Sequence, residues 1–516
     1  MSTSAGYVTD VSYVPGFFAH LAPTSLRYVA ALNRVTPPAT AGGFRYLELG
    51  CGLGRSLTTL AAANPQGQFV GIDINPEHTA FAGNEITAGG LTNARVITSG
   101  FDGLPADVGQ FEFIVLHGVY SWVSPAIREQ ILEVLRRHLA PGGLVLASYN
   151  ALPGWAHLQP IRGILRQYAA LRQGDSLQRI REAAGYLVYI RDKHAKYFED
   201  NPRASAYVDS LLKMDPRYLV HEYLNEHWTS FYFAEAAAAF RTAGLGFTGS
   251  LPYHTNFWDL CVRPEFQELF RTTTDRLVTE AHKDFCANTA FRWDVFAREP
   301  RPLTSLDDRL RVADDFHFFL PAADPRLPYQ ANLGVVTTTL HGPVYQGLID
   351  FLAGGSRRLG EILAAPALAG VPRDELAKVV DVGVALGLIG LSAGPIGPIP
   401  EAVPERLAVP CRFNRALLES CPLTGQTLTL ASTRTGTGHA LGDFEAVLLW
   451  DLLARGREGA AERLDTRLQA SGRTVQRDGQ PVADAAERRK IIDDRIADVQ
   501  RSMIPQLLRL GILAPA

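Results

Sequence analysis

The chain has 516 residues, of which 47% are hydrophobic and 20% are charged, and it contains no low-complexity tract. A chain of this length exceeds what one hydrophobic core supports, so two to four globular domains are expected. The formal net charge of −3 gives no electrostatic reason to expect a nucleic-acid partner, which usually produces a basic surface stripe.

The cysteines and the N-terminus bear on the compartment. The sequence contains no C-x-x-C pair, and its five cysteines are scattered: Cys51, Cys261, Cys286, Cys411 and Cys421. This pattern argues against a disulfide framework and against a zinc site, so no metal is expected. The opening MSTSAGYVTD lacks the features of a signal peptide, and no apolar run is long enough for a membrane span. We therefore expect a soluble, cytoplasmic protein.

Residues 44–150 alternate between strand-like and helix-like segments with short connections. A helix is expected from Pro76, where the missing N–H of proline costs nothing, and another over 124–139, where apolar residues recur at helical spacing. Strands buried on both faces and separated by helices predict an α/β fold with a doubly wound, Rossmann-like parallel sheet. Its expected strands are 44–50, 68–75, 94–100, 111–118 and 143–150.

The pattern after Asn150 predicts two helical insertions and further units. A strand is expected at 245–251, and FRWDVFAR (291–298) is expected as a last edge strand that closes the sheet. The next unit has a winged-helix-like α+β rhythm without a basic recognition helix, which favours protein docking over DNA binding. The expected units are a leader (1–43), the core (44–150), a helical insertion (151–230), a segment completing the sheet (231–300), a winged-helix-like domain (301–393) and a C-terminal domain (394–516) that begins with a Pro-rich linker.

The strongest chemical signal is LELGCGLGRS (47–56). A glycine loop between a strand and a helix lets the backbone approach a ligand, and the helix N-terminus offers free N–H groups. Asp73 ends the next strand, where an acid accepts hydrogen bonds from ribose hydroxyls. This context predicts a nucleoside ligand held by Gly50, Cys51, Gly52, Gly54, Asp73 and the adjoining Ile74.

Glu48 distinguishes between nucleoside ligands. The acid lies two residues before the first glycine, where it would repel the pyrophosphate of a dinucleotide. It suits the ammonium and sulfonium of S-adenosylmethionine, and E-x-G-x-G-x-G is the form that class I methyltransferases use. A nicotinamide enzyme is the alternative function. The alternative for Glu48 itself is an incidental acid at the end of a strand.

Two further strand ends are expected to contact the donor. Phe101 and Asp102 follow the third strand, where such enzymes hold adenine; otherwise Asp102 is a loop acid that faces solvent. His117 and Gly118 follow the fourth strand. His117 either supports the methionine end of the donor or is a satisfied strand-end histidine.

HGVYSWV (117–123) follows the same strand, where the acceptor must enter. It carries neither the Asn-Pro-Pro-Tyr of DNA amino-methylating enzymes nor the Pro-Cys of cytosine enzymes, and His117 stands where a metal-dependent catechol enzyme needs an acid. Tyr120 and Trp122 alternate around Ser121 and are expected on one side of the loop, lining an acceptor pocket; hydrophobic packing is the alternative. Aromatic faces attract an ammonium, and burial lowers the pKa of a lysine from about 10.4 toward the reactive neutral form. Tyr149 and Asn150 end the fifth strand and are expected to contact the acceptor.

LELGCGLG, HGVYSWV, SYNALPGW (148–155) and HEYL (221–224) together resemble the rickettsial-type protein lysine methyltransferases, which carry a methyltransferase regulatory domain. DFCANTAFRWDVFAR (284–298) is similar to the closing motif of that domain, and Tyr7 and Tyr13 resemble the tyrosines of the family's leader. The resemblance implies S-adenosylmethionine as donor, a protein substrate methylated on lysine, donor contacts from Tyr7 and Tyr13, and a homodimer. Within HEYL, Glu222 is the best acidic candidate for orienting an ammonium.

Three functions follow as hypotheses. The preferred one is N-methylation of protein lysine. The second is methylation of a small metabolite or saccharide, and the third is a donor-binding scaffold with little turnover.

Overall fold

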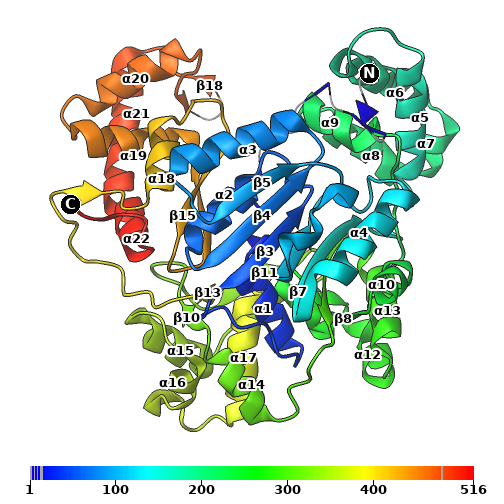
Figure 1. The fold of residues 1–516 in the computed structure, drawn as a ribbon. Coiled ribbons are helices and arrows are strands. Elements are labelled where there is room, and N and C mark those ends of the chain that lie inside the picture. The colour runs from blue at the N-terminus through cyan, green and yellow to red at the C-terminus, as the bar shows by residue number, and fades with distance from the viewer. Residues whose placement is uncertain (1–2, 5, 9, 12–15, 478–479) are drawn as a thin grey trace.

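Helices surround one central sheet in the computed structural model, which describes residues 3–4, 6–8, 10–11, 16–477 and 480–516 (Figure 1). The sheet has seven strands in the order β5 (Ala94–Thr98), β4 (Gly67–Asp73), β3 (Phe44–Leu49), β6 (Phe111–Leu116), β7 (Leu139–Asn150), β9 (Phe291–Arg298) and β8 (Leu245–Leu251). The five strands expected between residues 44 and 150 are all present, and the Rossmann-like α/β fold is confirmed.

The sheet differs from the expected one in β9. This strand pairs antiparallel with both β7 and β8, so the sheet is mixed and β9 is an internal strand. This internal strand carries two charged residues, Arg292 and Asp294. Both side chains are buried, and they pair with each other at 2.8 Å. Mutual neutralisation therefore allows two charges inside the sheet.

Two hydrophobic cores cover the two faces of the sheet. On one face, α1 (Pro23–Leu32) and α2 (Arg55–Ala63) pack against β3 and β6. On the other face lie α4 (Pro125–His138) and α10 (Phe233–Thr242). Ser124 caps α4 by accepting the N–H of Ile127, and basic residues end that helix, which matches its expected bounds. The helix α3 (Pro76–Gly89) follows β4 and packs against β5.

Two helical insertions interrupt the sheet. The first has its own core, which also takes up Val8 and Val11 of the leader; it comprises α5 (Gln159–Ala170), α6 (Ser176–Asp192), α7 (Lys196–Asp200), α8 (Pro202–Leu211) and α9 (Pro216–Tyr223). The second separates β8 from β9 and comprises α11 (Trp258–Cys261), α12 (Gln267–Thr272) and α13 (Arg276–Ala287). Both insertions leave β7, β8 and β9 free to pair.

The segment after the sheet forms another core, which includes Tyr28 of α1. Its elements are α14 (Leu306–Ala313), β10 (His317–Phe319), β11 (Tyr329–Asn332), β12 (Thr337–Leu340), α15 (Pro343–Ala353), α16 (Leu359–Leu363), α17 (Arg373–Ala385) and β13 (Gly390–Ser392). Tyr28 donates a hydrogen bond of 2.8 Å to Asp381 of α17, which ties this segment to α1 on one face of the central sheet.

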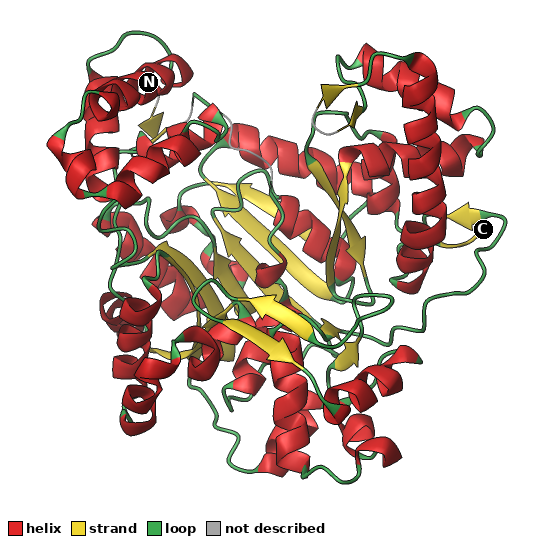
Figure 2. Cartoon of the chain, turned by 180° about the vertical axis from the view of Figure 1, so that it is seen from behind, coloured by secondary structure: helices red, strands yellow, loops and turns green. Residues whose placement is uncertain are grey.

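The last part of the chain, residues 407–516, is called the C-terminal unit below. It contains β14 (Leu407–Ala408), α18 (Arg412–Glu419), β15 (Thr427–Ser432), β16 (Thr437–Gly442), α19 (Asp443–Arg455), α20 (Ala460–Ala470), α21 (Ala485–Asp498), α22 (Ile504–Arg509) and β19 (Ala514–Pro515). Its core takes up Ala62 and Ala63 of α2, and Phe413 packs on Gly89 of α3. Seen from both sides, the unit lies against the helices that follow β3 and β4 (Figures 1 and 2). Among the described residues, no helix has both the length and the apolar character needed to cross a membrane.

Candidate active site

The loop after β3 is shaped by its glycines. Gly50, Gly52 and Gly54 all have positive φ, at 70°, 53° and 74°. A Cβ on Gly50 would lie 2.5 Å from Val119, and one on Gly54 would lie 2.6 Å from Ala82. The loop therefore needs glycine both for its left-handed backbone and for close packing. Within the described part of the chain, and leaving aside its two chain neighbours, no atom lies within 4 Å of a Cβ placed on Gly52, so the loop is open there.

Asp73 holds this loop from the neighbouring strand. Its Oδ2 accepts the N–H of Gly52 at 2.8 Å, and its Oδ1 accepts the N–H of Asn75 at 2.9 Å. His78 Nδ1 lies 3.3 Å from the same Oδ1. A carboxylate has about four lone-pair positions, so one remains for a ribose hydroxyl. Asp73 thus has a second function, as a brace of the glycine loop, that the sequence pattern did not predict.

These elements enclose a cavity of about 200 Å³ at the carboxyl ends of β3, β4, β5 and β6. Of the residues expected to bind the donor, it is lined by Glu48, Gly50, Cys51, Gly52, Gly54, Asp73, Ile74, Phe101, His117 and Gly118; Trp122, an expected acceptor residue, lines it as well. Sequence reasoning missed several other lining residues, among them Gly16, Phe18, Arg55, His78, Ser99 and Gly100. Ligands of doubly wound sheets bind at this edge.

Glu48 is a buried acid in the wall of this cavity. Burial, with the charge of Asp73, raises the pKa of its carboxyl to about 8. Its Oε2 is buried and has no hydrogen-bond partner among the described residues. An unpartnered carboxyl oxygen is costly unless a ligand cation pairs with it. The site therefore fits the ammonium of S-adenosylmethionine. Burial also raises the pKa of the neighbouring Cys51 thiol, which stays neutral.

His117 stands at the end of β6 among aromatic rings. Its Nδ1 lies 2.8 Å from Oγ of Ser148, and its ring centroid lies 4.0 Å from that of Phe18 and 5.2 Å from that of Trp293. Burial, with His20 nearby, lowers the pKa of His117 to about 4, so the imidazole is neutral at pH 7. Phe18, His20 and Trp293 lie far from His117 in the chain, and only the fold brings them together.

Tyr120 and Trp122 diverge, contrary to the expectation that they share one side. Residues 120–122 form a turn closed by Trp122 N–H to Val119 O at 2.9 Å, so the alternation of an extended strand does not apply. Trp122 lines the cavity, whereas Tyr120 is 2% exposed and packs between Phe231 and Phe240. Burial raises the pKa of Tyr120 to about 12. The structure thus places Tyr120 in the core beneath α10, where it does not reach the cavity.

Asp102 also lies outside the cavity. It sits in a short 3-10 turn, Phe101–Gly103, and its side chain is exposed. Phe101 lines the cavity and Asp102 does not, so the contact of Asp102 with adenine stays a prediction beside the loop-acid alternative. Ser99 and Gly100 line the cavity at this strand end instead.

Tyr149 is fully buried beside a charged network. Its hydroxyl donates to Asp294, which also pairs with Arg292 of β9. Arg292 reaches Asp284 at 2.7 Å and Glu280 at 2.8 Å, both on α13. Tyr149 therefore joins the sheet to the second helical insertion, and its expected acceptor contact is not found.

Asn150 and Glu222 are brought together next to the cavity, outside its lining. The N–H of Asn150 donates to Ser121 Oγ at 2.8 Å, one residue before Trp122. Burial raises the pKa of Glu222 to about 7, and Trp228 and Asn150 lie close enough to lower it in part. Oε1 of Glu222 and Nδ2 of Asn150 are nonetheless buried without a hydrogen bond of ordinary geometry within the described chain.

The leader reaches the cavity from the side of α9. Val8 N–H donates to Asn225 at 2.9 Å, and His221 lies 2.8 Å from the carbonyl of Val11. Gly16 and Phe18 then line the cavity. Of the two expected leader tyrosines, Tyr13 lies outside the described residues, and for Tyr7 only the backbone, in β2 (Tyr7–Val8), is described.

The strand order, with one antiparallel strand beside the edge, and a donor cavity whose acid suits an ammonium define a class I methyltransferase that uses S-adenosylmethionine. A methyltransferase-domain model matches residues 47–143, and a model for a predicted methyltransferase regulatory domain matches residues 215–298. The chain belongs to the methyltransferase family that carries this regulatory domain, because a relative of full length is 30% identical over 516 residues.

That relative is the uncharacterized protein sll1526 of Synechocystis sp., and the match covers 99% of this chain and 100% of that protein. The uncharacterized protein RP028 of Rickettsia prowazekii is 32% identical over 232 residues, 43% of this chain and 89% of that protein. The structure of PKMT2 from Rickettsia typhi in complex with AdoHcy has the same fold, with a TM-score of 0.73 at 19% identity, covering 97% of this chain and 100% of that one.

Proposed function

We propose that the protein N-methylates lysine side chains of a protein substrate. The observation that carries this proposal is the composition of the cavity wall near the end of β6, which Phe18, His117 and Trp122 line. A neutral imidazole and two aromatic rings attract an amine. They place no negative charge beside it, so they do not hold it in its protonated form. The two acids of the lining, Glu48 and Asp73, lie at the ends of β3 and β4 and serve the donor.

The reaction needs a neutral amine aligned with the methyl group. S-adenosylmethionine, when bound, supplies that methyl group on a sulfonium. Trp122 and Phe18 narrow the path by which the amine reaches the methyl group, and they exclude water. The rate of transfer then depends chiefly on how well the amine is positioned. Glu222 and Asn150 lie beside this wall, buried and close to each other. We assign them to the incoming ammonium: Glu222, with a pKa of about 7, is suited to orient it and to take its proton before transfer.

A labelling experiment tests the proposal against the other acceptors. The protein is incubated with S-adenosylmethionine labelled on the methyl group and with native cell extract. Label in protein supports the proposal, and acid hydrolysis must then yield methylated lysine. Label only in low-mass material supports a small-molecule acceptor, and label in nucleic acid would overturn the expectation that none is bound. The expected homodimer is measured separately by light scattering after gel filtration.

A further inference from the structure

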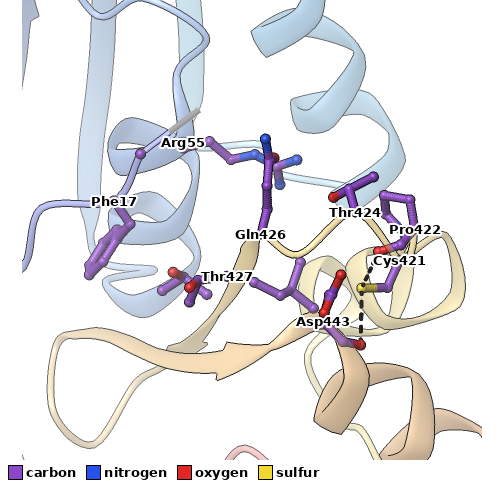
Figure 3. Close-up of a pocket in the computed structure, with 11 residues that line it drawn as sticks. Phe17, Arg55, Cys421, Pro422, Thr424, Gln426, Thr427 and Asp443 are labelled. Carbon is purple, nitrogen blue, oxygen red and sulfur yellow. Dashed lines mark hydrogen bonds between the residues drawn. The ribbon is translucent and has the colours of Figure 1, made fainter. Parts of the chain in front are cut away.

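Arg55 occupies the boundary between the donor cavity and a second, smaller cavity. It is the first residue of α2, and it lines both spaces together with Gly16. The second cavity, of about 70 Å³, is drawn in Figure 3. Its remaining walls are Phe17 and residues of the C-terminal unit: Cys421, Pro422, Thr424, Gln426, Thr427, Leu428, Thr429 and Asp443.

The charges of the donor cavity leave one end of the donor unmatched. Glu48 suits the ammonium, and Asp73 suits the ribose. The methionine part of the donor also carries a carboxylate, which requires a cation or several hydrogen-bond donors when it leaves water. Among the described residues that line the cavity, Arg55 is the only arginine or lysine, and His117 is neutral.

Arg55 retains donors for a carboxylate. One of its terminal nitrogens, Nη1, pairs with Oε1 of Glu85 at 2.6 Å. A guanidinium has five N–H donors in a planar fork, so one such pair leaves the other edge available. The side chain is 26% exposed, which permits the small rotation that contact with a ligand requires.

The C-terminal unit fixes the helix that carries Arg55. Nδ2 of Asn64, at the end of α2, donates to the carbonyl of Gly436 at 2.9 Å. A Cβ on Gly438 of β16 would lie 2.9 Å from both Phe17 and Thr59, so strand, helix and leader are in close contact there. The position of Arg55 therefore depends on a unit that begins more than 350 residues later in the chain.

We propose that Arg55 binds the carboxylate of the donor and that the C-terminal unit, through Gln426 and its neighbours, closes this end of the donor site. The unit is then part of the donor-binding machinery, and its docking on α2 and donor binding favour each other. This proposal goes beyond lysine methylation and does not depend on it, because it concerns the donor alone.

Two ligands separate the carboxylate from the rest of the donor. S-adenosylhomocysteine carries the amino-acid part, and 5′-methylthioadenosine lacks it. In calorimetry, Arg55→Gln should lower the affinity for S-adenosylhomocysteine by about 10- to 100-fold, the range for a lost hydrogen bond to a charged group. The same substitution should change the affinity for 5′-methylthioadenosine by no more than about twofold, which also shows that the variant is folded. Equal loss for both ligands, or no loss for either, would overturn the assignment. Arg326→Gln, at an exposed arginine paired with Asp324, is the matched control.

The part played by the C-terminal unit is tested by Gln426→Glu, a nearly isosteric change. The added charge faces the second cavity and should weaken S-adenosylhomocysteine by about 10-fold through repulsion and competition for Arg55, with 5′-methylthioadenosine unaffected. Unchanged affinity for S-adenosylhomocysteine, or an equal loss of affinity for both ligands, would show that the C-terminal unit does not contribute to the donor site. Gln330→Glu, on the exposed side of β11, controls for charge alone.

Discussion

The backbone N–H of Gly52 donates a hydrogen bond of 2.8 Å to Oδ2 of Asp73, so the acid of one strand fixes the glycine loop of its neighbour. Asp73→Asn replaces one acceptor oxygen with a donor and leaves the N–H of either Gly52 or Asn75 unpaired. We expect the affinity for S-adenosylhomocysteine, measured by calorimetry, to fall by about 10-fold or more. Asp107→Asn makes the same chemical change at an exposed acid of the turn Ala106–Val108 and should have no effect. Equal affinities for the two variants would contradict the assignment of Asp73 as a brace of the glycine loop.

Glu48 should make donor binding release a proton. Burial raises its pKa to about 8, so the ligand-free carboxyl is largely protonated at pH 7, and pairing with an ammonium requires the carboxylate. Affinity should therefore rise with pH up to about 8 and then level off. Calorimetry in two buffers of different ionisation enthalpy measures the proton released. Glu48→Gln should abolish the release. If this variant still releases one proton at pH 7, the proton comes from another group.

Tyr120 and Trp122 should respond differently to truncation. Tyr120→Ala opens a space in the core between Phe231 and Phe240 and should lower the free energy of unfolding by about 3 kcal/mol or more. Trp122→Ala removes part of the cavity wall and should lower methyl transfer by about 10-fold with little change in thermal stability. Tyr120→Phe keeps the ring and serves as control. If Tyr120→Phe loses methyl transfer without losing stability, Tyr120 contributes to the acceptor site after all.

Glu222 should give methyl transfer its dependence on pH. Because its pKa lies near 7 and the proposed function requires the carboxylate, the rate should rise as pH increases through about 7. Glu222→Gln should lower the rate and remove this ionisation from the profile. Glu226→Gln, four residues away at an exposed acid, should leave both unchanged. A wild-type profile retained in Glu222→Gln would exclude this residue from proton transfer.

The network around Arg292 should contribute strongly to stability. Arg292→Met leaves Glu280, Asp284 and Asp294 buried without their shared partner, which costs about 3–5 kcal/mol when one side of a buried pair is removed. Arg271→Met removes exposed contacts with Glu268, Gln267 and the ring of Trp258 and should cost about 1 kcal/mol or less. Urea unfolding measures the loss of stability in both variants. Similar midpoints would contradict a large contribution of the Arg292 network to stability.

Local patterns predicted the donor half of the site. The glycine loop, Glu48 and Asp73 lie within thirty residues of one another, and strand–loop–helix geometry fixes where they point. The direction of Tyr120 was beyond such reasoning, because it depends on a turn whose form the sequence pattern did not reveal.

Contacts between distant segments were also out of reach. Phe18, His20 and Trp293 meet His117 only because β9 enters the sheet beside β7 and the leader crosses the strand ends. The residues of a strand do not reveal which strand it pairs with, and β9 is internal although it carries two charged residues, Arg292 and Asp294. A sequence signal did exist, since two opposite charges spaced two residues apart on one strand face lie within reach of each other.

The internal position of β9 has a consequence for biosynthesis. When the ribosome has completed β7, the partner of that strand is still about 150 residues from emerging, roughly 7–30 s at 5–20 residues per second. Throughout that interval the nascent sheet exposes an open, apolar edge of the kind that recruits other chains. The first helical insertion, which has a core of its own together with the leader, is made in the same interval.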